Sequence, residues 1–106
     1  MRLLIIIVQE VDYPRLSDAF VAHEIRATKF LTEGLYLNKK NITLMVCIQE
    51  DRLEEVFGYI RESCTERIEE REVSEYNGQD FVDVVRGIKI GGATVFNIGV
   101  DEILKF

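Results

Sequence analysis

The fold class is decided by the stretch Leu3-Leu4-Ile5-Ile6-Ile7-Val8, which opens the chain. This short, mostly β-branched apolar run is typical of a central strand buried on both faces. It is far shorter than the roughly 20 apolar residues of a membrane-spanning helix. Gln9 and Glu10 end it without the small-residue pattern of a signal-peptide cleavage site, so we expect a cytoplasmic protein that does not bind membranes.

Helical and extended patterns alternate after this strand. Apolar residues at helical spacing predict a helix over residues 14–25, because Pro14 suits a first helical turn. Thr28, Phe30 and Thr32 alternate with Lys29 and Leu31, which predicts a second strand over residues 28–34. The apolar run 43–48 predicts the strand that pairs with it in a hairpin. Residues 38–41 are polar and are expected to form the turn between them.

The second half of the chain contains the clearest helix and the least clear segment. Asp51 and Glu54 have the spacing of a capping box, and the apolar residues of 53–64 recur on one helical face. The carboxylate-rich residues 65–80 leave three alternatives open: a longer helix, an exposed strand or a mobile loop. Four further segments are expected at the end: a strand or ribbon over 81–90, a break at Gly91-Gly92, a last strand over 93–100, and a short helical turn over 100–106.

The resulting order of elements is β-α-β-β-α-loop-β. We predict an α+β fold, a ferredoxin-like (βαββαβ) sandwich in which an antiparallel sheet carries two helices on one face. Residues 1–106 have the length of one domain with one core.

The net charge and the cysteine content restrict the kinds of ligand that the protein can bind. The net charge of −6 disfavours nucleic acid polymers, because phosphate backbones are bound by clustered Lys and Arg. A small anion needs only a local basic patch. Cys47 and Cys64 form neither a CxxC pair nor a zinc set, so we expect reduced thiols and no metal.

Enzyme signatures are missing from the sequence. His23 is the only histidine, and we expect a structural role for it on the core side of the first helix. Gly87 and Gly92 have the spacing of a phosphate loop, but Ala93 stands where that motif needs lysine. We therefore expect a protein that is not an enzyme.

Three short segments are unusual for a plain structural domain. Gly91-Gly92 precedes a strand and brings backbone amides close to a ligand, or else forms a turn or bulge. Arg26 and Thr28 offer a guanidinium and a hydroxyl at a strand start, although such residues are also ordinary surface. Residues 34–37 with Asn41 place an aromatic ring and an amide in a hairpin loop, where both can contact a nucleobase.

Taken together, these segments resemble the PII-like cyclic di-AMP receptors, small signal-transduction proteins of Gram-positive bacteria. The resemblance covers the whole chain and is strongest in Gly91-Gly92-Ala93-Thr94-Val95-Phe96, followed by Val100-Asp101. It is supported by four further segments: Leu4 to Gln9, Arg26-Ala27-Thr28-Lys29, the loop from Gly34 to Asn41, and Glu62-Ser63-Cys64.

The resemblance implies a homotrimer that binds cyclic di-AMP in clefts between subunits and rearranges its loops. It implies no cofactor beyond this nucleotide, and a downstream protein partner that the sequence does not identify. The acidic residues 65–80 would match the family's long loop, a partner-contacting or switch element. The implied ligand contacts are Arg26 and Thr28 at the phosphates, Asn41 at an adenine, Leu35, Tyr36 and Leu37 around the base, Cys47 beside the ligand, and Gly91, Gly92 and Phe96 from the neighbouring strand.

Four positions depart from the family's pattern. Leu35 and Cys47 stand where glycine is common, Tyr36 replaces a usual Phe, and Lys105 replaces a usual amide. A branched residue held at positive φ costs roughly 1–2 kcal/mol, and a thiol narrows a pocket that glycine would leave open. The alternative hypothesis is therefore a divergent PII-like interaction module that binds another adenine nucleotide or none. A small enzyme on the same sandwich is a third hypothesis, disfavoured because no acid, base and nucleophile occur together.

Overall fold

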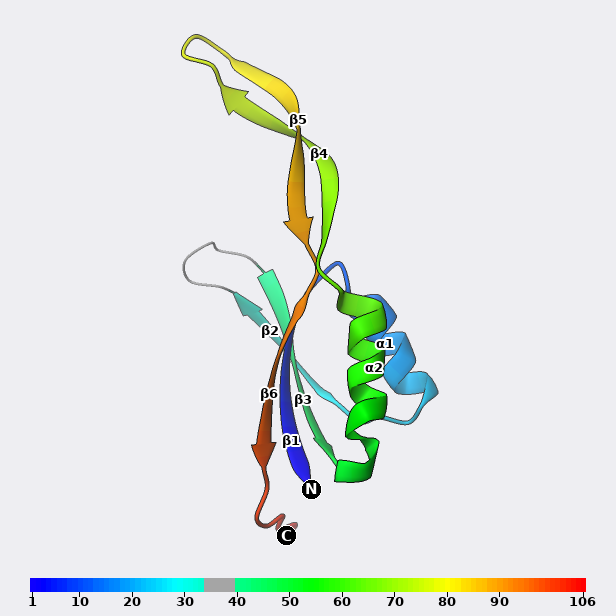
Figure 1. Ribbon diagram of the computed structural model, residues 1–106. Coiled ribbons are helices and arrows are strands. Elements are labelled where there is room, and N and C mark those ends of the chain that lie inside the picture. Colours follow the sequence, from blue (N-terminus) through cyan, green and yellow to red (C-terminus); the bar gives the residue numbers. More distant parts are fainter. Residues whose placement is uncertain (34–39) are drawn as a thin grey trace.

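Four strands form one antiparallel sheet in the order β2-β3-β1-β6 (Figure 1). The computed structural model describes residues 1–33 and 40–106. The predicted central position of the first strand is confirmed, because β1 pairs with both β3 and β6. The strands span Arg2–Gln9 (β1), Thr28–Glu33 (β2), Lys40–Ile48 (β3) and Ala93–Gly99 (β6).

Two helices cover one face of this sheet (Figure 1). They are α1 (Tyr13–Ala22) and α2 (Leu53–Cys64), the latter preceded by a 3₁₀ turn, Glu50–Arg52. Leu4, Ile6 and Val8, which alternate along β1, point toward the two helices and are buried. The core contains Leu4, Ile6 and Val8 from β1, Leu16 and Phe20 from α1, Val56, Ile60 and Cys64 from α2, and Ile42, Leu44, Val46 and Ile48 from β3. In the described residues, no helix is long and apolar enough to cross a membrane.

The opposite face of the sheet has no cover among the described residues. Leu3, Ile5 and Ile7 of β1 lie on it and are only half buried, so the expectation of burial on both faces is wrong for the single chain. We call this surface the open face. Its exposed members from the neighbouring strands include Phe30, Met45, Cys47, Phe96 and Ile98. Contiguous exposed apolar residues of this kind are typical of an interaction surface.

Residues 67–90 form a separate two-stranded ribbon that projects from the sheet (Figure 1). Its strands are β4 (Arg67–Tyr76) and β5 (Phe81–Ile90), and the Asn77 side chain closes the turn by accepting from the amides of Gln79 and Asp80. The ribbon raises the radius of gyration to 17.6 Å, against about 13 Å for a compact chain of this length. Of the three alternatives for residues 65–80, the exposed strand is therefore correct.

The first helix ends three residues before the predicted boundary. The amide of Ile25 donates to the Phe20 carbonyl at 2.8 Å and that of Glu24 to the Val21 carbonyl at 3.3 Å. Together with the φ of 56° at Glu24, this is a Schellman motif. The usual residue at the left-handed position is glycine, and its replacement by glutamate removed the signal from the sequence.

Three other local expectations are wrong. Asp51 lies in the 3₁₀ turn and Arg52 is the N-cap of α2, without a side-chain cap bond, so there is no capping box. Lys40 and Asn41 belong to β3 rather than to the polar turn. Residues 101–106 form no helix and are exposed. Each error lies at the end of an element, where local sequence patterns are weakest.

His23 is not a core residue, contrary to expectation. It follows α1, is exposed, and stacks on Tyr59 with ring centroids 4.6 Å apart. The Tyr59 hydroxyl donates to Glu55 at 2.8 Å, and Arg52 donates both to Glu55 and to the His23 carbonyl at 3.0 Å. Hydrogen bonds from Arg52 and Tyr59 hold the pKa of Glu55 below its usual value. The cluster joins the end of α1 to the start of α2.

Truncation of Leu16 tests the position of the core. Leu16 is fully buried between α1 and the sheet, so Leu16→Ala is expected to lower the free energy of unfolding by about 2–5 kcal/mol. The measurement is urea unfolding followed by circular dichroism. Leu31→Ala is the matched control, because Leu31 is 75% exposed. Equal losses for the two variants would contradict the described core.

Candidate functional site

The predicted ligand residues that the structure describes lie in two separate pockets and, for Phe96, on the sheet between them. The first, which we call the Arg26 pocket, has a volume of about 350 Å³. The second, the Gly91 pocket, has a volume of about 270 Å³. Leu3, Arg26, Ala27, Thr28, Met45 and Cys47 line the former; Ile7, Gln9, Asn41, Glu66, Gly91, Gly92, Ala93 and Thr94 line the latter.

The Arg26 pocket is built where β2 begins, across the open face. The register places Thr28 opposite Met45 and Leu3 opposite Cys47, so the hydroxyl and the thiol share one wall. Within the described residues, the side chains of Arg26 and Thr28 have no hydrogen-bond or ion-pair partner of their own. A free guanidinium beside a free hydroxyl can bind an anion through charge-assisted hydrogen bonds.

The Gly91 pocket depends on two left-handed glycines at the end of the ribbon. Gly91 has a φ of +81° and Gly92 a φ of +84°, which β-carbons disfavour. A β-carbon on Gly91 would also lie 2.7 Å from the Thr65 carbonyl. The Gly91 amide donates to the Gln9 side chain at 2.8 Å, and the Gly92 amide donates to the Cys64 carbonyl. Both amides are thus engaged within the chain, and the geometry favours the turn interpretation over amides presented to a ligand.

A buried ion pair fixes the base of the ribbon next to this pocket. Asp12 is 3% exposed, and its Oδ1 accepts a hydrogen bond from Arg67 Nη2 at 3.0 Å. Its Oδ2 is buried and has no partner in the part of the chain that the structure describes. The contact joins positions 55 residues apart, so no local motif could have revealed it.

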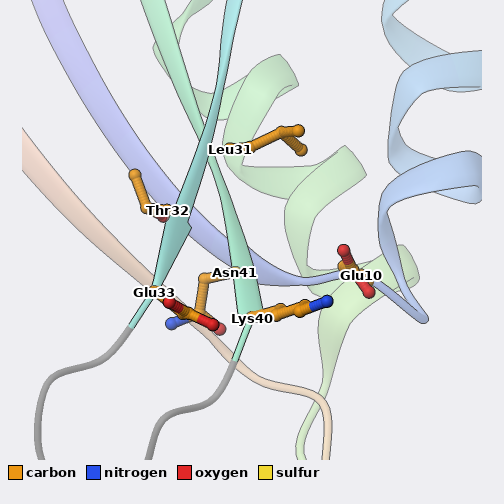
Figure 2. Close-up of a pocket in the computed structure, with 6 residues that line it drawn as sticks. All are labelled: Glu10, Leu31, Thr32, Glu33, Lys40 and Asn41. Carbon is orange, nitrogen blue, oxygen red and sulfur yellow. The ribbon is translucent and has the colours of Figure 1, made fainter.

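Asn41 also lines a third pocket, of about 260 Å³, at the end of the β2–β3 pair (Figure 2). Its other lining residues are Glu10, Leu31, Thr32, Glu33 and Lys40. Figure 2 shows the Lys40 side chain extending toward Glu10. Leu35, Tyr36 and Leu37, expected to contact a base, belong to the segment 34–39 and lie outside the described residues. The described part of the chain nevertheless places Asn41 where that segment rejoins the sheet.

The Arg26 and Gly91 pockets occupy opposite ends of the open face. Cys47 lines one and Asn41 the other, and these residues are six positions apart in β3. At about 3.3 Å per residue the separation is roughly 20 Å. Phe96 pairs with Ile5 and lies between the two ends, exposed on β6. One protomer therefore presents the described members of the predicted set in two separate pockets rather than in one.

The two thiols differ in environment. Cys47 is exposed in the Arg26 pocket, whereas Cys64 is buried in the core. Burial, assisted by the nearby Asp12 carboxylate, raises the pKa of the Cys64 thiol to about 11. Thiolate is the reactive form of cysteine, so Cys64 is expected to be inert near neutral pH.

Alkylation measures this difference. Native protein treated with iodoacetamide at pH 8 is expected to be modified at Cys47 at least about tenfold faster than at Cys64. Peptide mass spectrometry at timed intervals gives both rates, and urea-unfolded protein supplies the control in which the rates converge. Faster modification of Cys64 than of Cys47 in the native protein would contradict the described burial.

Comparison with known proteins identifies the family of this chain. The family model described as cyclic-di-AMP receptor matches residues 1–106. A solved structure of a protein described as functionally unknown, from Pediococcus pentosaceus ATCC 25745, is 34% identical in sequence with a TM-score of 0.75. The similarity covers 99% of this chain and 96% of that chain. Since the family model spans every residue, the chain belongs to the cyclic-di-AMP receptor family.

Proposed function

We propose that this chain is a cytoplasmic, non-enzymatic signal receptor that binds cyclic di-AMP in the clefts between subunits of a homotrimer. One observation supports the proposal: the predicted ligand residues that the structure describes line two pockets, here taken as half-sites, at opposite ends of an apolar sheet face that no other described element covers. Family membership supports the nucleotide. The geometry supports its position between subunits.

The strand order supports a ferredoxin-like, PII-like domain over residues 1–106. The order β2-β3-β1-β6 is antiparallel, and a helix connects β1 to β2 and another follows β3. The β4–β5 ribbon is then an insertion between the second helix and the last strand of that pattern.

The open face supports assembly. Leu3, Ile5 and Ile7 are only half buried in the single chain, and Phe96 and Ile98 beside them are exposed. Covering such a face against neighbouring copies removes apolar area from water at roughly 25 cal/mol per Å². Assembly through this face would also bring the Arg26 pocket of one subunit toward the Gly91 pocket of the next.

The chemistry of the two half-sites fits a cyclic dinucleotide. The unpaired Arg26 guanidinium and Thr28 hydroxyl suit phosphate oxygens. The Asn41 amide has both a donor and an acceptor, which matches the adjacent donor and acceptor of an adenine edge. Thr28 lies opposite Met45, four positions from Asn41 in β3, so roughly 13 Å of strand separates the Thr28 and Asn41 backbones in one protomer. This is farther than the phosphate of a single nucleotide lies from its base. A complete site therefore takes Arg26 and Thr28 from one subunit and Asn41 from another, while the segment holding Leu35, Tyr36 and Leu37 would rearrange around the base.

A second candidate function rests on Cys47. Its side chain lines the Arg26 pocket, where it takes space beside the two anion-binding groups. This observation favours a divergent module that binds another adenine nucleotide or only a protein partner. Titration with several nucleotides separates the two functions.

Calorimetric titration tests the receptor function. Cyclic di-AMP is expected to bind saturably at about one molecule per subunit, with ATP and cyclic di-GMP as controls. Arg26→Ala is expected to weaken binding by roughly ten- to a hundredfold, because it removes a hydrogen bond to a charged group. Arg61→Ala, on an exposed part of α2, is the matched control. Tighter binding of ATP, or no heat with any nucleotide, would transfer support to the divergent module.

Mixed assemblies test whether the site is shared between subunits. Homotrimers of Arg26→Ala subunits and homotrimers of Asn41→Ala subunits are both expected to bind cyclic di-AMP poorly. The two kinds of subunit are then coexpressed with different tags and purified as mixed trimers. If Arg26 of one subunit and Asn41 of the next meet one ligand, every mixed trimer contains a single interface where both residues are intact. Calorimetry is then expected to show about one site of parental affinity per mixed trimer. Mixed trimers as defective as the two parents would mean that both residues serve a ligand within one protomer.

A further inference from the structure

The two faces of the β4–β5 ribbon differ in how their charges are satisfied. Strand alternation and the register of Tyr76 with Phe81 assign each residue to one face. On the first, which we call the paired face, Arg86 donates to both Glu75 oxygens at 2.8 and 2.7 Å, and Arg71 donates to Glu69 at 3.0 Å. These ion pairs lie with the half-buried Val73, Val84 and Ile88. The paired face is therefore electrically balanced and its apolar residues are partly covered.

The other side, which we call the bare face, has neither property. Its large apolar side chains are between 62% and 73% exposed, and the rings of Tyr76 and Phe81 contact each other at a centroid distance of 5.4 Å. Its carboxylates have no ion-pair partner within the described residues. Its cation, Lys89, lies at the base of the ribbon, 4.0 Å from Glu66. The apolar residues are Ile68, Tyr76, Phe81 and Val85, and the carboxylates are Glu70, Glu72 and Asp83.

The ribbon also lacks the layer that normally stabilises a hairpin. It is a sheet of two strands that projects away from the core (Figure 1). Its attachments at the base include the Asp12–Arg67 pair, the Gln9–Gly91 hydrogen bond and the hydrogen bond from the Gly92 amide to the Cys64 carbonyl. A two-stranded hairpin is marginally stable in water unless another element covers one of its faces. The bare face is the one with apolar area left for such a cover.

We propose that the bare face binds a basic, amphipathic segment of a partner protein. Apolar side chains of that segment would pack on Ile68, Val85 and Phe81, and its Lys or Arg side chains would pair with Glu70, Glu72 and Asp83. A second copy of this face is disfavoured, since two bare faces would place carboxylate against carboxylate. Nucleic acid and anionic membranes are disfavoured for the same electrostatic reason. The inference rests on the proposed receptor function only in that it names the kind of downstream partner.

Binding of a model peptide tests the proposal on the intact full-length protein. The probe is a fluorescent amphipathic peptide of about 18 residues, built from Leu and Lys at helical spacing. Fluorescence anisotropy is expected to show saturable binding that weakens with salt. Glu70→Gln with Glu72→Gln is expected to weaken it about tenfold, and Phe81→Ser to weaken it further. A peptide with Glu in place of Lys is expected not to bind.

A matched charge control separates this face from general acidity. Asp18→Asn with Glu62→Gln removes the same two charges from exposed sites on α1 and α2, and is expected to change the affinity by less than about twofold. An equal loss in this control, or no peptide binding by the parent protein, would overturn the proposal.

Hydrogen exchange locates the bound peptide. Protection is expected in residues 67–90, whereas protection confined to the helices would overturn the proposal. Phe81→Ser is also examined by sedimentation without peptide, because a smaller assembly than the parent's would identify a second copy as the occupant. The same variants are titrated with cyclic di-AMP. Their nucleotide affinity is expected to stay at the parental value, so that a failed docking surface remains distinguishable from a failed receptor function.

Discussion

The rest of the structure depends on one constraint: β1 is apolar on both faces, but residues 1–33 and 40–106 cover only one of them. Leu4, Ile6 and Val8 are buried beneath α1 and α2, whereas Leu3, Ile5 and Ile7 face outward. A central strand holds its neighbours in register, so its outward residues determine the character of the whole open face. Both candidate half-sites lie at the two ends of that face. The outward half of this one strand thus connects the core with the proposed subunit interface and the proposed ligand site.

The same strand also positions the ribbon. The side chain of Gln9, the last residue of β1, accepts a hydrogen bond from the Gly91 amide. Asp12, three residues further along, accepts a hydrogen bond from the Arg67 side chain. The ribbon enters and leaves the core through these contacts, which border the Gly91 pocket. Positive φ angles at Gly91 and Gly92 allow the chain to turn there into β6 without a steric penalty. The pocket wall and the ribbon base are therefore made from the same residues.

Sequence patterns predicted most of the sheet and both helices, because burial on one face leaves a periodic signal. These patterns failed where an element ends without the residue type that usually marks its end. Glu24 occupies the left-handed position that glycine usually takes, so the end of α1 was misplaced. Residues 65–80, which contain β4, stayed undecided because that strand buries little and carries charged residues on both of its faces. Family membership, by contrast, followed from short motifs along the whole chain.

By itself the sequence determined the order of elements up to the end of α2, the central position of β1, the acidic balance and the family. Each of these depends on residue type and on spacing within a short segment, and therefore survives without three-dimensional information. The tertiary structure alone decided that Arg26 and Asn41 lie at opposite ends of one face and that Asp12 pairs with Arg67. It also decided that the carboxylates on one face of the ribbon have no ion-pair partner among residues 1–33 and 40–106. These features arise from strand register and side-chain alternation between segments far apart in the chain, which no local pattern encodes.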